Sequence, residues 1–160
     1  MVMVFYLILV AVLLVAAYFG KRKFGMLGLA LATGSVLSGI WGYDAGLVVG
    51  ALGIRTSTFT SAIAVSVVIL LPSVILMFGG HRYKSEIGRI VGASMFVLLA
   101  VAFLIEPLSH VLVYNGPGLN AYNWLFNNRQ FIIGVGLTIA VVELFLAKPA
   151  HLPEKHHKKH

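Results

Sequence analysis

One acidic side chain is placed where it could carry chemistry, because Glu143 lies inside the apolar run 130–147. An ionisable group within a membrane-spanning segment is costly unless it is paired or neutral, and such groups often mark proton or ion sites. Arg89 begins another apolar run and is expected at a similar depth, so it is the natural partner. Lys148 is a poorer partner, because a separation of five residues turns it about 140° away around a helix. The pair Glu143 and Arg89 indicates a proton or cation site or a structural ion pair, and we favour the structural pair.

Two other carboxylates are expected near the opposite membrane surface. Asp44 and Glu106 each end an apolar run, and His110 and Arg129 could pair with them. Together they could form a vestibule for a cationic solute. Carboxylates at helix ends are usually solvated, and we expect that simpler arrangement here.

The residue types give no pattern for catalysis or for a cofactor. The chain has no cysteine and contains no HExxH, P-loop, dinucleotide-binding or GxSxG pattern. The tail 149–160 is rich in Lys and His and could hold zinc or nickel loosely. We interpret it instead as a basic segment that lies on anionic lipid headgroups. The sequence predicts a protein that is not an enzyme, with no catalytic residue, metal site or cofactor.

The composition is that of an integral membrane protein. Of the 160 residues, 59% are hydrophobic and only 11% are charged, against about 25% charged residues in a soluble domain. A span needs about 20 apolar residues, so the length suits several spans with short loops. We expect an all-α, polytopic bundle of five transmembrane helices that forms one domain over 1–148, followed by the tail 149–160. The predicted spans are 2–19, 24–43, 59–78, 87–105 (ending at Glu106 and Pro107) and 130–147, with a loop and short amphipathic helix over 108–128.

The basic residues follow this alternation of spans. Ten of them lie in segments predicted to be internal, and only Arg55 and Arg129 lie in external ones. Because cytoplasmic loops are enriched in Lys and Arg, we expect a plasma (inner) membrane protein with its N-terminus outside and its C-terminus in the cytoplasm. The net charge of +7 is then a topology signal, and no nucleic-acid partner is expected. The internal residues are Lys21, Arg22, Lys23, Arg82, Lys84, Arg89, Lys148, Lys155, Lys158 and Lys159.

The second predicted span carries a regular groove of small residues. Because four residues exceed one helical turn by about 40°, a small residue at every fourth position makes a slanting groove that lets another helix approach closely. We expect this helix to be the centre of the bundle, and its groove to bind neighbouring helices or a second copy in a homo-oligomer. Residues 45–54 extend this helix, lie in the interface or re-enter the bilayer. The groove positions are Ala30, Gly34, Ser38, Gly42, Gly46 and Gly50.

Two segments resemble the colicin V production (CvpA) family of small bacterial inner-membrane proteins. One is the basic turn Gly20-Lys21-Arg22-Lys23-Phe24-Gly25, which leads into Leu27-Gly28-Leu29-Ala30. The other is Gly88-Arg89-Ile90-Val91-Gly92, where Arg89 and Gly92 fit the family pattern and Gly88 stands at its acidic position. The resemblance implies a non-enzymatic accessory or scaffold in toxin production or export and in envelope maintenance.

A second hypothesis comes from another class of protein. In it the chain is a small transporter or channel subunit that uses Glu143 for ion or proton coupling. This hypothesis predicts a polar cavity around the Glu143 carboxyl.

Overall fold

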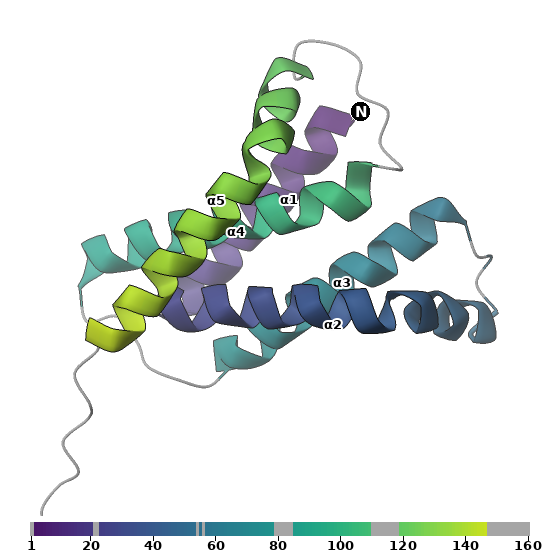
Figure 1. Ribbon diagram of the computed structural model, residues 1–160, viewed down its shortest axis with the longest axis horizontal. Coiled ribbons are helices and arrows are strands. Elements are labelled where there is room, and N and C mark those ends of the chain that lie inside the picture. The colour runs from purple at the N-terminus through teal and green to yellow at the C-terminus, as the bar shows by residue number, and fades with distance from the viewer. Residues whose placement is uncertain are drawn as a thin grey trace, which may run out of the picture.

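The structure is a computed structural model, and it describes residues 2–20, 23–53, 55, 57–78, 85–109 and 119–146. This part of the chain folds entirely as α-helices (Figure 1). Four helices, α2 to α5, are long and apolar enough to cross a membrane, whereas α1 offers only the shorter stretch Tyr6–Gly20. The all-helical, multi-pass character predicted from the sequence is therefore confirmed. The helices are α1 (Val2–Gly20), α2 (Phe24–Ala51), α3 (Thr58–Phe78), α4 (Glu86–Ser109) and α5 (Leu119–Leu146).

The helices gather at one end and spread apart at the other. In Figure 1 the end of α1, the start of α2, the end of α3, the start of α4 and the end of α5 all lie towards the left. We call this the closed end. The opposite ends spread towards the top and right, with α2 and α3 below and α1, α4 and α5 above (Figure 1). We call this the open end. Successive helices therefore run in alternating directions, as consecutive membrane spans must.

Helix α4 shares the centre of the bundle with α2, the helix that the small-residue pattern predicted as its centre. Helix α4 contacts all four other helices, whereas α2 contacts α3, α4 and α5 but not α1 within the described residues. Phe96, Leu99, Leu104 and Ile105 of α4 are fully buried. Leu27 and Leu31 of α2 are fully buried as well, and burial of such large side chains needs neighbours on several sides.

Helix α2 settles one open question about the predicted spans. It continues without a break to Ala51, so residues 45–51 are an extension of the second helix and not a re-entrant loop. The backbone N–H of Leu52 donates to the carbonyl of Val48, and Gly53 follows with φ of 75°. A left-handed glycine just after the last turn is a common helix terminator, because no Cβ opposes that conformation.

Two predicted boundaries near the open end are wrong. Helix α4 does not stop at Pro107 but continues to Ser109, whose hydroxyl donates to the Glu106 carbonyl at 2.7 Å. A proline in the last turn removes only its own hydrogen bond, so it need not end the helix there. Helix α5 begins at Leu119, so the segment 119–128 belongs to this long helix and is not a separate interfacial piece. That segment contains neither glycine nor proline to interrupt it.

Candidate functional site

The small-residue groove of α2 is filled by α3. A Cβ built on Gly34 would collide with the backbone carbonyl of Ile69, so the two main chains touch where the helices cross. Further along, a Cβ on Gly42 would lie 3.7 Å from Val65 Cγ2, and one on Gly46 would lie 3.9 Å from Ser61 Oγ. The positions from Gly34 to Gly46 therefore receive one partner within the chain. The self-association expected from this groove loses its physical basis.

The other groove positions differ in their surroundings. Ala30 is buried, Ser38 is half-buried, and Gly50 is exposed near the end of α2. The hydroxyl of Ser38 donates to the carbonyl of Ser35 at 2.8 Å. A second link between α2 and α3 comes from fully buried Ser73, whose hydroxyl donates to the Leu27 carbonyl at 3.2 Å.

Glu143 lies at the closed end, where it caps a neighbouring helix. Its Oε2 atom accepts a hydrogen bond from the backbone N–H of Gly25 at 2.5 Å. The first N–H groups of a helix have no partner inside that helix, and Lys23, the N-cap residue of α2, supplies no side-chain bond. A carboxylate there is also favoured by the helix dipole. Glu143 of α5 therefore satisfies the start of α2 from across the bundle.

Arg89 is directed to a different helix from Glu143. Its guanidinium Cζ lies 4.0 Å from the centroid of the Tyr18 ring, so it joins α4 to α1 by a cation–π contact. The predicted ion pair between Arg89 and Glu143 is not among the contacts of the described residues. The physical reason is the phase of the helices, because Arg89 points from α4 to α1 while Glu143 points from α5 to α2.

A second close crossing joins α2 to α5 beside Glu143. A Cβ on Gly28 would lie 3.1 Å from the Cβ of Ala140, and one on Gly25 would lie 2.5 Å from the Ala140 carbonyl. Ala140 is completely buried. The sequence held a signal for close packing of α5 that the prediction did not use, since Gly136, where a Cβ would meet Leu99 of α4, and Ala140 are small residues four positions apart.

Near the open end, Glu106 is paired with Arg129. The Arg129 guanidinium on α5 contacts both carboxylate oxygens of Glu106 on α4. Nη1 lies 3.1 Å from Oε2, and Nη2 donates to Oε1 at 3.3 Å. The Arg129 side chain also lies over the Phe126 ring, with Cζ 5.1 Å from its centroid. Asp44 is exposed on α2. His110 and the tail 149–160 lie outside the described residues.

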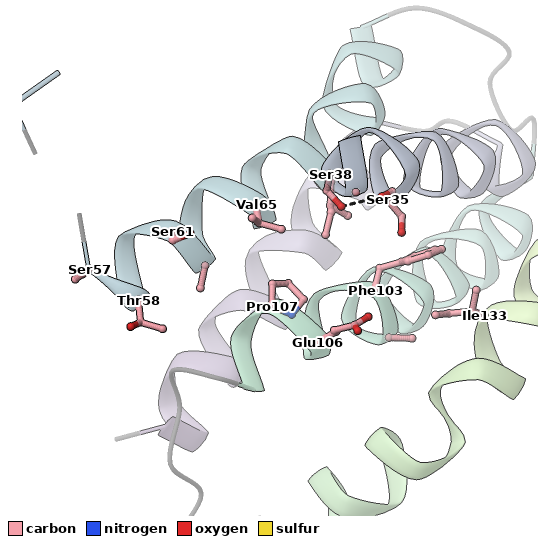
Figure 2. A pocket seen from close by; sticks show the side chains of 14 residues that line it. Ser35, Ser38, Ser57, Thr58, Ser61, Val65, Phe103, Glu106, Pro107 and Ile133 are labelled. Carbon is pink, nitrogen blue, oxygen red and sulfur yellow. Dashed lines mark hydrogen bonds between the residues drawn. The ribbon is translucent and has the colours of Figure 1, made fainter. Parts of the chain in front are cut away.

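These helices surround an inter-helix cleft of about 740 Å³, which lies on the open-end side of the crossing between Gly34 and Ile69. Figure 2 shows side chains of α2, α3 and α4 converging on this space, with Ile133 contributed by α5. Glu106 is the one charged residue in the lining, and the apolar side chains of the walls come from α3, α4 and α5. The lining is Ser35, Ser38, Gly39, Ser57, Thr58, Ser61, Ala62, Val65, Ile69, Ala102, Phe103, Glu106, Pro107 and Ile133.

The hydroxyls of the cleft fall into two groups. Ser57 is occupied as the N-cap of α3, since its Oγ accepts the Thr60 N–H at 3.2 Å and its own N–H donates to Thr60 Oγ1 at 2.7 Å. The side-chain hydroxyls of Ser35, Thr58 and Ser61 make no hydrogen bond within the described chain. These three groups are free to bond water or a ligand in the cleft. The sequence prediction missed them, because hydroxyls scattered over two helices give no signal until the crossing brings them together.

No protein family, curated protein or solved structure matches this chain at a significant level.

Proposed function

We propose that this chain is a non-enzymatic, multi-pass protein of the plasma membrane that binds a small amphipathic molecule in the inter-helix cleft. The observation that carries the proposal is the lining of the cleft, which combines the free hydroxyls of Ser35, Thr58 and Ser61 with apolar side chains. Ligand pockets of about 300–1,000 Å³ typically combine apolar walls with a few polar groups that fix orientation. The inter-helix cleft has this size and composition.

Glu106 sets the chemistry of the preferred head group. Its side chain is 65% exposed, although Arg129 holds both of its oxygens. A ligand head group that donates hydrogen bonds, such as an ammonium or a sugar hydroxyl, can bond the exposed side of the Glu106 carboxylate and the free hydroxyls of the cleft. An anionic head would face the Glu106 carboxylate and lose favourable contacts, because like charges repel.

A binding function suits this lining better than catalysis does. A serine or threonine becomes a nucleophile when an adjacent base takes its proton. The cleft lining offers hydroxyls and a single carboxylate, and that carboxylate is already engaged by Arg129. We also propose that α1 is the fifth span, which places the N-terminus outside and the open end, with the cleft, towards the exterior.

The absence of native cysteine makes the test direct. Single cysteines replacing Ser38 and Ser61 are introduced in proteoliposomes and treated with a cationic, membrane-impermeant methanethiosulfonate reagent. We expect both to be labelled, because the cleft opens to water. Dodecylamine or dodecyl glucoside below its micellar concentration should slow the labelling, and dodecyl sulfate at the same concentration should slow it less.

Two control positions separate binding from general effects of the amphiphile. Val67→Cys lies on an exposed apolar face of α3 outside the cleft lining and should stay unlabelled in the bilayer. Asp44→Cys is exposed outside the cleft lining and should be labelled at the same rate with and without amphiphile. Equal slowing at Asp44 and Ser61, or no slowing at all, would reject the binding proposal and leave only the accessory or scaffold role implied by the resemblance.

The transport hypothesis based on Glu143 has less support, because that carboxylate is occupied as a cap for α2. Ion flux in proteoliposomes that falls on Glu143→Gln substitution, while the fold is retained, would restore it.

A further inference from the structure

Helix α5 carries a stripe of polar and small residues on the side that points away from the bundle, beside exposed apolar side chains such as Phe131 and Phe145. Towards the bundle it presents Gly136, Ala140 and Glu143, which meet α4 and α2. On the opposite side polar or small residues recur every three or four positions, which places them on one face of a helix with 3.6 residues per turn. All of them are exposed. This outer face of α5 consists of Asn120, Asn123, Asn127, Gln130, Gly134 and Thr138.

Part of this face lies at membrane depth. Gln130 is 16 residues from the last residue of α5, which is about 24 Å along a helix, so it falls within a hydrocarbon core about 30 Å thick. Thr138 satisfies its own hydroxyl by donating to the Gly134 carbonyl at 2.8 Å. The side-chain amide of Gln130 makes no hydrogen bond within the described chain. Transfer of an unbonded amide into hydrocarbon is unfavourable, so lipid is a poor neighbour for this face.

We propose that the outer face of α5 is covered by α5 of a second copy of this chain. A two-fold axis along the membrane normal makes the two helices parallel and sets each residue of the face near its own counterpart. A glutamine amide carries both a donor and an acceptor, so Gln130 can bond its counterpart in both directions. No charged residue lies on the face to oppose its own copy, because Arg129 points inward to Glu106.

The shape of the face fits the same partner. A shallow depression runs along α5 between Gln130 and Thr138, and a Cβ added at Gly134 would meet nothing within 4 Å. A small residue at the centre of a helix face allows two backbones to approach closely, and amide hydrogen bonds then add to the packing. The inter-helix cleft lies on the other side of α5, so pairing through this face leaves it open.

Disulfide trapping in membranes tests the pairing. Gly134→Cys and Asn127→Cys are each introduced as the only cysteine, reconstituted at low protein density and oxidised with copper phenanthroline. We expect a covalent dimer as the main product for both. The control, Leu98→Cys on the exposed face of α4, should remain monomeric. Trapping of Leu98→Cys to the same extent, or failure of both α5 positions to cross-link, would overturn the proposal.

Fluorescence energy transfer between differently labelled copies, diluted with lipid, gives the strength of the pairing. Gln130→Leu should weaken association about tenfold, the size expected for loss of an interhelical amide hydrogen bond. Gln130→Asn keeps the amide and should retain most of the affinity. Equal affinity for Gln130→Leu and the native chain, or a native chain that stays monomeric at every dilution, would refute pairing through this face whatever the outcome at the inter-helix cleft.

Discussion

At the scale of single residues, the helix crossings depend on glycines as much as on the side chains that pack between the helices. The α2–α3 crossing needs glycine at position 34, because the carbonyl of Ile69 occupies the place where a Cβ would stand. Glu143 was recognisable from the sequence, since a carboxylate inside an apolar run is rare. Its partner was not, because the rotation of each helix about its axis is set by packing and not by the local sequence.

The crossing can be tested with two glycines of the same helix. Gly34→Ala should destabilise the protein by about 1–3 kcal/mol, the usual cost of overpacking, because Ile69 presents backbone that cannot move aside as a flexible side chain would. Gly39→Ala adds a methyl where nothing lies within 4 Å, and should be neutral or slightly stabilising. Thermal unfolding in detergent, followed by circular dichroism, measures both. A stability loss that is equal in the two variants would contradict the role given to Gly34.

At the scale of elements, the sequence predicted the helices well and their ends less well. The predicted spans 2–19 and 59–78 agree closely with α1 and α3, because charged or polar residues flank both apolar runs. The extensions of α2 and α5 were missed because hydropathy reports where a helix enters lipid, not where it stops. Gly53 is the signal that ends α2. Helix α5 begins as early as Leu119 because no glycine or proline interrupts the residues that follow.

The start of α2 depends on an acceptor from another element, which gives a second prediction. Glu143→Leu removes the acceptor for the Gly25 N–H and should cost about 1–3 kcal/mol, as for an unsatisfied buried donor. Glu143→Gln keeps an oxygen at the same place and should lose only the part due to the negative charge at the helix start, about 0.3–1 kcal/mol. Unfolding titrations in mixed micelles rank the three proteins. Equal losses for both variants would show that the charge, and not the hydrogen bond, is what stabilises this end.

At the scale of the whole molecule, the chain is two groups of helices that meet at the closed end and separate towards the open end. Helices α2 and α3 form one group, held by the Gly34 crossing and the Ser73 bond. Towards the open end α1, α4 and α5 lie together as the other group (Figure 1), whereas at the closed end α5 also packs on α2. Composition predicted the membrane class, but the inter-helix cleft follows from the angle between the two groups. No local pattern of residues encodes that angle.

The proposed topology of five spans is tested from the two sides of the membrane. In sealed, right-side-out vesicles, an impermeant thiol reagent should label Val2→Cys and Asp44→Cys. It should reach Ser85→Cys only after the vesicles are opened. Three proposed spans, α1 to α3, separate Ser85 from the N-terminus, so the two positions lie on opposite sides of the membrane. Labelling of Val2→Cys only after opening would reduce the count to four and reject the external N-terminus.

The lengths of α2 and α5 determine the side from which a ligand can enter the inter-helix cleft. Helices α2 and α5 have 28 residues each, about 42 Å, against a hydrocarbon thickness of about 30 Å. Tilts of membrane helices seldom exceed about 40°, so tilt alone does not bring both helices fully within the lipid. The last turns of α2 and the first turns of α5 therefore extend beyond the bilayer on the open-end side. Ser57 and Glu106 then lie near the outer membrane surface, and we expect a ligand to enter the cleft from the headgroup region.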